Sequence, residues 1–482
     1  MSNIILSPRL ATWLAALSAA FALTACGGGG GGGTSASTPS TPSTTVTATV
    51  TTTGPARAIA NTVLAYSAAV ANASASAFDW LWGDGAVNSS GASPAKVWNT
   101  AGTFAGTVTA TVNGQPVSGN QTVTVVAEPV SVGLDHTCAI QPSGSVLCWG
   151  DNNFGQLGDG TLVNKTTTVV VTNLTNTIAL SAGNYHTCTL KANGRAGCWG
   201  NNDNGQLGDG TTVNKTTPVA VAGLSNAVAI SAGSSYTCAL KANGTVACWG
   251  ENGDGQLGDG TTVDRISPVA VTGLTDVVAI DVGDAHSCAI KANGSVACWG
   301  YNRYGQLGDG TIVDKPTAVA VIVLTDAVAL SAGNDHTCAL KANGSVACWG
   351  RNSDGQLGDG TKTSQSTPGP VTGLTDAVSL SAGGYHTCAL RANGSLVCWG
   401  YNGFGQLGDG TMVFKSVPTA VTGLSDAVAL SAGRVHTCAL KNNGNLACWG
   451  KNENGQLGDG TFGVTANKLV PTAVAGGAIF WQ

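Results

Sequence analysis

The chain has 482 residues, enough for two or three domains with a sizeable core. Only 10% of the residues are charged, the net charge is −5, and Lys and Arg nowhere form a cluster. Because binding to phosphates needs a basic surface, these features argue against nucleic acid as a partner.

The first 25 residues have the pattern of an export signal. Arg9 is their only charged side chain, and the apolar run from Leu10 to Ala25 is too short for a comfortable membrane span. The run ends in Leu-Thr-Ala-Cys, which resembles the lipobox of bacterial lipoproteins, where cleavage precedes a cysteine that takes the lipid. We therefore expect residues 1–25 to be a lipoprotein signal peptide and Cys26 to be lipidated; an ordinary signal peptide with an incidental cysteine is the alternative.

Residues 26–45 are rich in Gly, Ser, Thr and Pro. As a random coil this segment would reach about 25 Å, which suits a tether between a lipid anchor and exported domains. We expect the protein on the cell envelope, at the outer membrane or cell surface, with the lipid as its sole contact with the membrane.

Residues 46–127 have a different composition from the rest. Alternating apolar residues in Thr-Val-Thr-Ala-Thr-Val and Gln-Thr-Val-Thr-Val-Val, with frequent turns, predict an immunoglobulin-like β-sandwich. Two segments, Phe78 to Gly85 and Val97 to Val112, resemble the polycystic-kidney-disease (PKD) repeat, with Trp98 and Phe104 in its aromatic places. The resemblance implies an extracellular spacer, or a module that contacts carbohydrate or protein.

From residue 128 onward the sequence repeats every 50 residues. Each of seven copies contains two short apolar runs around Asn-Gly, a Gly-Gln-Leu-Gly-Asp-Gly-Thr loop and two further apolar runs. Four strands per copy without helical periodicity predict an all-β, seven-bladed propeller over residues 128–482, and a solenoid of β-arches is the alternative. Ala478–Phe480 falls where the last run begins in other copies, so we expect it to complete the first blade and close the ring.

Two cysteines lie ten positions apart in every copy. If residues 341–345 form a turn with Gly344 in the left-handed position, Cys338 faces Cys348 with Cα atoms about 4.5 Å apart, at the short end for a disulfide. Export supplies an oxidising compartment. We predict seven disulfides within the blades; buried apolar thiols are the alternative, and the spacing does not suit zinc. The residues are Cys138, Cys148, Cys188, Cys198, Cys238, Cys248, Cys288, Cys298, Cys338, Cys348, Cys388, Cys398, Cys438 and Cys448.

The string from His336 to Thr361, like its six counterparts, resembles the regulator of chromosome condensation repeat family in a cysteine-bearing, exported form. The resemblance implies a seven-bladed propeller. The founding member is a nucleotide-exchange factor for a small GTPase that acts through an inserted hairpin and one face. Other relatives, one of them resembling a secreted inhibitor of β-lactamase, bind partners through loops on one face. Here only the seventh copy is longer, by three residues between Thr461 and Pro471.

Several residue types that often carry chemistry occur at fixed repeat positions. We expect structural hydrogen bonds rather than a metal ring from the histidines, because Tyr236 replaces one of them, and turns rather than calcium sites from the Gly-Asp-Gly-Thr loops. Matches to Gly-x-Gly-x-x-Gly at Gly253 and Gly403 precede no helix and carry no weight. The histidines are His136, His186, His286, His336, His386 and His436.

The informative positions are those at which the copies disagree: the pair after Ser-Ala-Gly, the residue after Cys-Trp-Gly and the residue three further on. A constant scaffold with varied loop ends is typical of binding surfaces, and aromatic residues and Arg are common anchors. We predict that one face binds a protein or glycan, and drift on an unused surface is the alternative. The predicted anchors are Tyr185, Tyr301, Tyr304, Arg351, Tyr385, Tyr401 and Phe404.

The sequence therefore predicts a non-catalytic binding protein with no catalytic residues, no cofactor and no metal site. Its partner would be an envelope or extracellular protein or glycan. A guanine-nucleotide exchange factor, a passive surface module and an envelope or glycan hydrolase are the alternatives.

Overall fold

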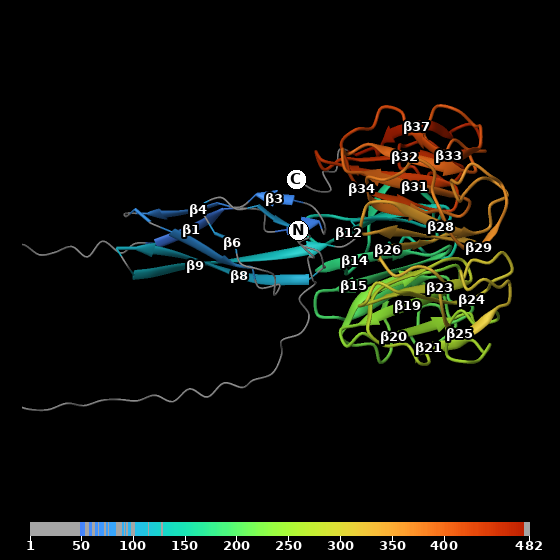
Figure 1. Cartoon of the computed structure of the whole chain (residues 1–482), viewed down its shortest axis with the longest axis horizontal. Helices are drawn as coiled ribbons and strands as arrows, with labels where there is room; N and C mark the ends of the chain where they lie inside the picture. Colours follow the sequence, from blue (N-terminus) through green and yellow to red (C-terminus); the bar gives the residue numbers. More distant parts are fainter. Residues whose placement is uncertain are drawn as a thin grey trace, which may run out of the picture. The chain divides into compact units, whose positions relative to one another are not determined.

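The computed structural model describes residues 49–53, 57–59, 63–65, 67–71, 74–75, 77–82, 89–90, 92, 95–97, 102–113, 115–126 and 129–476 (Figure 1). These residues form strands, turns and loops, and no helix long and apolar enough to cross a membrane occurs among them. The predicted signal peptide, Cys26 and the tether lie outside the described residues. The chain divides into two compact units, the second of which contains all of residues 129–476.

The strands before residue 127 form one five-stranded sheet, in the order β2-β9-β8-β5-β6, and two pairs, β1-β4 and β3-β7. The rings of Trp80 and Trp82 stack with centroids 4.9 Å apart, and both side chains are buried, as is Val108. The PKD-like positions Gly83–Gly85 and Trp98 lie outside the described residues. The strands are β1 (Thr49–Thr53), β2 (Arg57–Ile59), β3 (Val63–Ala65), β4 (Ser67–Ala71), β5 (Ala77–Leu81), β6 (Ser89–Ser90), β7 (Ala95–Val97), β8 (Gly102–Val112) and β9 (Gln115–Val126).

Residues 129–476 form seven four-stranded antiparallel sheets, which we call blades 1 to 7 in chain order. The first strands are β10 (Val130–Val132), β14 (Thr177–Ala182), β18 (Ala227–Ala232), β22 (Val277–Val282), β26 (Ala327–Ala332), β30 (Ala377–Ala382) and β34 (Ala427–Ala432). The second strands are β11 (His136–Ile140), β15 (His186–Lys191), β19 (Tyr236–Lys241), β23 (His286–Lys291), β27 (His336–Lys341), β31 (His386–Arg391) and β35 (His436–Lys441).

The third strands are β12 (Val146–Gly150), β16 (Ala196–Gly200), β20 (Val246–Gly250), β24 (Val296–Gly300), β28 (Val346–Gly350), β32 (Leu396–Gly400) and β36 (Leu446–Gly450). The outermost strands are β13 (Lys165–Val170), β17 (Lys215–Ala220), β21 (Arg265–Ala270), β25 (Lys315–Ala320), β29 (Gln365–Pro370), β33 (Lys415–Ala420) and β37 (Lys468–Ala473). The prediction of an all-β chain with four strands per copy is confirmed.

The first strand of each blade precedes the cysteine hairpin in the sequence. The blade therefore begins one strand earlier than a repeat unit that starts at this hairpin. The strand that resembles Ala-Val-Ala-Leu is innermost, and it pairs with the His-Thr-Cys strand that follows it in the sequence. In blade 1 this place is taken by Val130–Val132, so the expectation that Ala478–Phe480 completes this blade is wrong. The reason is local: Pro129 to Gly133 already supplies an extended apolar strand directly before His136. Ala478–Phe480 itself lies outside the described residues.

The antiparallel order brings two sets of loops to one end of every blade. The turn between the first and second strands and the long loop between the third and fourth strands share this end, which we call the loop face. The Asn-Gly hairpins and the connections between blades lie at the opposite end. The three variable positions of each copy therefore lie on the loop face.

The cysteines are paired as predicted. Cys338 faces Cys348 in the β27–β28 register, the two are disulfide-bonded, and their Cα atoms are 4.1 Å apart. The hairpin turn also has the expected form, since the Lys341 N–H donates to the Ser345 carbonyl and Gly344 has a φ of +81°. The other six pairs repeat this arrangement.

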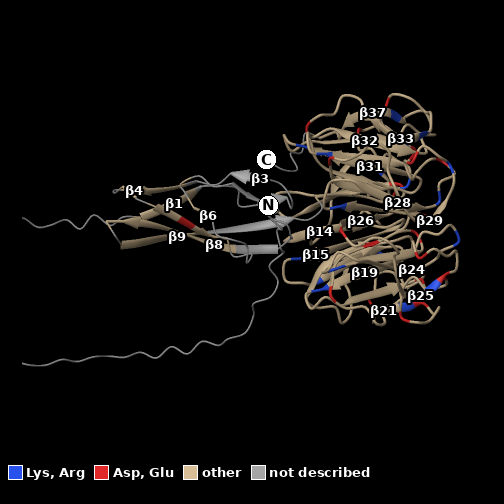
Figure 2. Cartoon of the chain, in the orientation of Figure 1, with Lys and Arg blue, Asp and Glu red and all other residues tan. Residues whose placement is uncertain are grey.

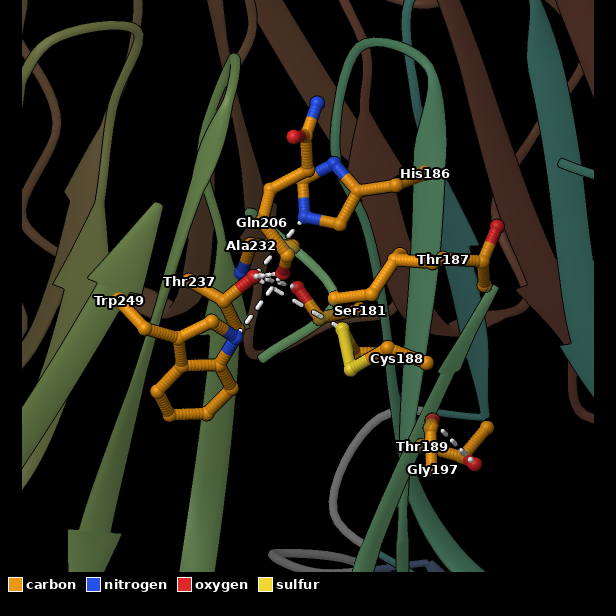
Figure 3. The surroundings of a disulfide bond; sticks show 12 residues. Ser181, His186, Thr187, Cys188, Thr189, Gly197, Gln206, Ala232, Thr237 and Trp249 are labelled. Atoms are coloured by element: carbon orange, nitrogen blue, oxygen red, sulfur yellow. Dashed lines mark hydrogen bonds between the residues drawn. A yellow bond between two sulfur atoms is a disulfide. The ribbon is translucent and has the colours of Figure 1, made fainter. Parts of the chain in front are cut away.

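Neighbouring blades are joined at one backbone carbonyl in the long loop (Figure 3). The Gln206 carbonyl accepts hydrogen bonds from the Thr237 hydroxyl, at 3.0 Å, and from the Trp249 indole N–H, at 2.9 Å, both in the next blade. Trp249 is completely buried. The same pair of bonds to a Gln carbonyl recurs at all seven junctions, with Ser287 in place of Thr in blade 4.

The buried histidines belong to the same junctions. The His186 Nε2 lies 2.9 Å from the Thr237 hydroxyl oxygen, whose proton is already donated to Gln206. Thr237 must therefore accept, and His186 is the neutral tautomer with its proton on Nε2. Five other histidines make the same bond, and in blade 3 the hydroxyl of Tyr236 donates to the His286 carbonyl instead. This confirms the structural role expected for the histidines.

The ring closes between blade 7 and blade 1 by the same contacts that join the other blades. The His436 ring bonds to Thr137 at 2.9 Å, and the Val132 N–H donates to the Ser431 hydroxyl at 3.2 Å. Blade 1 thus stands in the same relation to blade 7 as to blade 2. Within residues 129–476, each blade is built from four consecutive strands, and no strand is exchanged between blades 1 and 7.

The disulfides predict the outcome of a thiol titration. Under denaturing, non-reducing conditions, none of the fourteen paired cysteines should react, and all should react after reduction. Replacing Cys338 and Cys348 together by Ala should lower the free energy of unfolding by about 2–3 kcal/mol, because a short closed loop is released in the unfolded chain. Fourteen reactive thiols before reduction would contradict the pairing.

The histidines predict instability in mild acid. Burial lowers the pKa of His136, His186, His336 and His386 to about 3, and that of His286 to about 4. The unfolded chain takes up these protons below pH 6.5 and the folded chain does not, so stability is complete above pH 6.5 and is lost as the pH falls toward 3. Urea unfolding should show a free energy that drops steeply between pH 7 and pH 5.

His336→Tyr is the matched control, because it copies the residue of blade 3. Its free energy of unfolding should depend less steeply on pH than that of the wild type. An unfolding free energy that stays constant from pH 7 to pH 5 would refute the assignment of neutral, buried imidazoles.

Candidate functional site

Six of the seven predicted anchors lie together on the loop face of blades 4 to 6. Tyr301 and Tyr304 follow β24, Arg351 follows β28, and Tyr385 lies between β30 and β31. Tyr401 and Phe404 follow β32. Their backbones are held by the repeat itself: the Tyr304 N–H donates to Oε1 of Gln306, and the Tyr401 N–H donates to the Tyr385 carbonyl. The side chains are therefore presented by a rigid scaffold.

These side chains form a continuous row of aromatic rings, with the guanidinium of Arg351 in its middle. Tyr301 contacts Tyr304 with ring centroids 6.4 Å apart. The Arg351 guanidinium lies 5.6 Å from the Tyr304 ring and 5.3 Å from the Tyr385 ring. The ring centroids of Tyr385 and Tyr401 are 6.2 Å apart, and two phenylalanine rings continue the row from Tyr401.

Phe404 and Phe414 extend the row at blade 6, with ring centroids 6.1 and 4.6 Å from that of Tyr401. Lys451 of blade 7 lies over Phe404 at 5.9 Å, and Lys362 of blade 5 lies over Phe414 at 5.9 Å. We call the set Tyr301, Tyr304, Arg351, Tyr385, Tyr401, Phe404 and Phe414 the aromatic strip. Ring–ring contacts and cation–π contacts each contribute about 0.5–1.5 kcal/mol, so the strip is preorganised rather than loose.

Phe414 is not among the anchors predicted from the sequence, although the repeat contains a signal that could have identified it. In the other six copies this position holds Asn, Asp or Ser, whose side chain accepts a hydrogen bond from the backbone N–H of the loop Asn. A phenylalanine has no acceptor, so blade 6 gives up this bond and gains a half-exposed ring beside Tyr401. The loss of this hydrogen bond in exchange for an exposed aromatic side chain indicates that residue 414 has a role other than stabilising the fold.

Tyr185 does not join the strip. Its ring packs against Phe154 of blade 1 with centroids 5.1 Å apart, and it is 36% exposed. Tyr185 therefore lies on the predicted face but outside the row that the other six anchors form. Tyr185 and Phe154 form a separate pair on the loop face of blades 1 and 2.

Neighbouring carboxylates partly neutralise Arg351 of the strip and Lys451 beside it. Arg351 forms ion pairs with Asp335 at 3.4 Å and Asp354 at 3.7 Å, and Lys451 pairs with Asp135 at 3.3 Å. Burial raises the pKa of Asp335, an effect that the charge of Arg351 opposes. The pairs fix the orientation of the cations against the rings.

Carboxylates predominate beside the strip, on the loop face of blades 3 and 4. Glu251, Asp254, Asp264 and Asp284 lie there, and burial together with the charges of the three aspartates raises the pKa of Glu251. In residues 129–476, the charged residues lie mostly in loops and at strand ends (Figure 2). The loop face is thus chemically uneven, with an acidic sector next to the aromatic strip.

The Gly-Asp-Gly-Thr loops are turns, as expected. Asp209 accepts bonds from the Thr211 N–H and hydroxyl and from the Asn202 amide, and its second oxygen lies 3.6 Å from Lys215. The carboxylate is therefore fully used within its own loop. Within the described part of the chain, no group of three or more His, Cys, Asp or Glu could hold a metal ion.

Comparisons with known proteins agree on one family. Residues 164–480 match the profile of the RCC1-like domain, and residues 129–156 match that of the regulator of chromosome condensation (RCC1) repeat. A comparison with curated proteins found no match.

Solved structures show the same fold. Human WBSCR16 is 22% identical with a TM-score of 0.62, over 69% of this chain and 95% of that one. Yeast RCC1 (Prp20), solved with Kap60 bound to it, is 21% identical with a TM-score of 0.63, over 73% and 85%. Prp20p from Saccharomyces cerevisiae, described with its binding to Gsp1p and histones, is 22% identical with a TM-score of 0.62, over 73% and 87%. At these identities the likeness concerns the fold alone.

Substitutions in the strip and in the core should differ in their effect on the free energy of unfolding. Tyr304→Ala removes a side chain that is 39% exposed and should change the free energy of unfolding by less than about 1 kcal/mol. Trp349→Ala removes a completely buried ring and its bond to Gln306 and should cost about 3–5 kcal/mol. Urea unfolding measures both, and equal costs would show that the strip belongs to the core.

Proposed function

The chain belongs to the RCC1-like family, and we propose that it is a non-catalytic, protein-binding, seven-bladed propeller whose binding site is the aromatic strip. The observation that carries this proposal is the row of aromatic rings, with Arg351 among them, from Tyr301 to Phe414 on three adjacent blades. Tyr, Phe and Arg side chains held in place before binding cost little entropy when a partner covers them.

A protein suits this surface better than a glycan. The yeast relative is seen with Kap60 bound, and its second structure is described with binding to Gsp1p and histones. The strip also mixes rings with paired charges, which is the composition of a protein interface with an anchored centre and a polar rim. A glycan partner, which we also considered from the sequence, remains the weaker alternative.

We further propose where the propeller is displayed. A lipidated Cys26, the tether of residues 26–45 and a PKD-like, immunoglobulin-like sandwich over residues 46–127 would hold residues 128–482 away from the cell envelope. The stacked Trp80 and Trp82 and the five-stranded sheet support a folded module before the propeller. The seven disulfides support an oxidising compartment.

Exchange of guanine nucleotides is the main alternative. The family resemblance assigns that activity to an inserted hairpin, whereas copies 1 to 6 of this chain have the same length and the seventh is only three residues longer. A passive surface module is the second alternative. It does not explain why Phe414 replaces the Asn, Asp or Ser that accepts a hydrogen bond from the loop backbone in the other six copies.

Site-specific photo-crosslinking in the producing cells tests the proposal. p-Benzoylphenylalanine replaces Tyr304 in one variant and Val470 of the outermost strand β37 in another, since both side chains are 39% exposed. We expect one discrete cross-linked protein from position 304 and none from position 470. Changing Tyr301, Tyr401 and Phe404 together to Ala should reduce that product at least about tenfold, because truncating interface anchors typically costs more than ~1 kcal/mol each.

Thermal unfolding of each variant serves as the control for folding. The same cross-linked products from both positions, or a yield that the triple variant leaves unchanged, would remove the strip as the binding site.

A further inference from the structure

The first strands of the seven blades surround a central cavity of about 330 Å³. One position of each strand places an oxygen in its wall, and a backbone N–H of the next blade donates to that oxygen at 2.9 to 3.2 Å. Six blades have serine at this position and blade 4 has Asp281. We call these seven residues the oxygen ring: Ser131, Ser181, Ser231, Asp281, Ser331, Ser381 and Ser431.

Asp281 brings a negative charge into a ring that is otherwise neutral. One carboxylate oxygen accepts the Ser231 hydroxyl at 2.9 Å and the other accepts the Ala332 N–H at 2.9 Å. Within residues 129–476, no Lys, Arg or His forms an ion pair with Asp281. Hydrogen bonds from neutral donors therefore hold the carboxylate, and no Lys, Arg or His of residues 129–476 pairs with it.

The other charged residues in the cavity wall have partners of their own. The Arg434 guanidinium donates to the Tyr385 hydroxyl at 3.1 Å, and the Asp284 carboxylate accepts the Asn184 amide at 3.2 Å. Both lie in the turns at the loop face, beyond the end of the first strand. Asp281 lies deeper, in the strand β22 itself.

A carboxylate that is partly buried in a cavity wall and has no counter-charge has two ways to reduce its free energy. It can take up a proton, or it can bind a cation. Burial raises the pKa of Asp281, while its hydrogen bonds to the Ala332 N–H and the Ser231 hydroxyl oppose that shift. The wall of the cavity favours the second way, because the Ser231 and Ser331 hydroxyls lie next to the carboxylate and a hydroxyl that accepts one N–H retains a second lone pair.

We propose that the oxygen ring binds a small monovalent cation, held by the carboxylate of Asp281 and neighbouring serine oxygens. A single carboxylate supplies one negative charge, whereas sites for divalent ions usually combine several carboxylates. An alkali-metal ion and a primary ammonium group share this chemistry, since both carry one charge and both are satisfied by oxygen acceptors. This site is independent of the aromatic strip.

The repeat supplies a matched control. Asp281→Ser restores the residue that six blades already carry, so the variant keeps an acceptor for the Ala332 N–H. Asp281→Asn keeps the shape of the side chain and removes only its charge. Neither change touches a junction carbonyl, a disulfide or the aromatic strip.

Thermal unfolding of the whole protein is measured at pH 7.5 and constant ionic strength while choline is replaced by sodium, potassium, ammonium or methylammonium. A ligand that binds the folded state alone raises the unfolding midpoint as its concentration rises. We expect such a rise for the wild type with at least one of the four ions and none for either variant. A rise with sodium or potassium identifies an inorganic ion, and a rise with methylammonium alone identifies an organic amine.

Two results would overturn the proposal. The first is an equal response of the wild type and both variants, which places any ion elsewhere. The second is no response of the wild type to any of the ions, together with a stability difference from Asp281→Asn that vanishes as the pH falls, which shows that the carboxylate takes up a proton instead. Sodium-23 line broadening, present with the wild type and absent with Asp281→Ser, provides an independent readout for sodium.

Discussion

The pair of hydrogen bonds to one backbone carbonyl at each blade junction is the constraint on which the structure depends. The Gln206 carbonyl can accept from both Thr237 and Trp249 only if the long loop of blade 2 reaches the second and third strands of blade 3. The Thr237 hydroxyl then has one lone pair for His186, which settles the tautomer of the imidazole. A single geometry thus accounts for the hydroxyl residue of the second strand and the Trp of the third strand in every copy, and for the His of the second strand in six of them.

This constraint separates the residues that hold the ring from those that are free to vary. The junction side chains are buried and hydrogen-bonded, so substitutions there carry the full cost of an unpaired polar group or a cavity. The loop ends beyond the junction pay no such cost, and they differ between copies. Aromatic and basic residues gather at these ends on blades 4 to 7, whereas carboxylates gather on blades 3 and 4. A rigid ring with an uneven face is suited to holding one partner in one orientation.

Departures from the repeat are informative where they carry a local cost. Phe414 replaces a capping residue and places a ring next to Tyr401. Asp281 replaces a serine and puts a charge into a neutral wall. Tyr236, in contrast, replaces a histidine and still bonds to the neighbouring blade through its hydroxyl, so it conserves the junction by other means. Among the described residues, the first change leaves the loop N–H without its usual side-chain cap and the second adds a charge without an ion pair, which is the physical ground for the functions proposed for them.

The sequence by itself determined the strand content, the disulfide pairing and the loop face. Cys338 and Cys348 flank a five-residue turn, and a two-residue side-chain period leaves only one register in which they meet. The shared face of the variable loop ends was also predictable, because rotation of a 50-residue unit brings equivalent positions to one face. Only the tertiary structure decided which strand opens each blade, that Tyr185 stands apart from the strip, that Phe414 packs beside Tyr401, and that Asp281 lines the central cavity. These outcomes depend on contacts between different blades, and the distance between residues of two blades is set by the closed ring rather than by their separation along the chain.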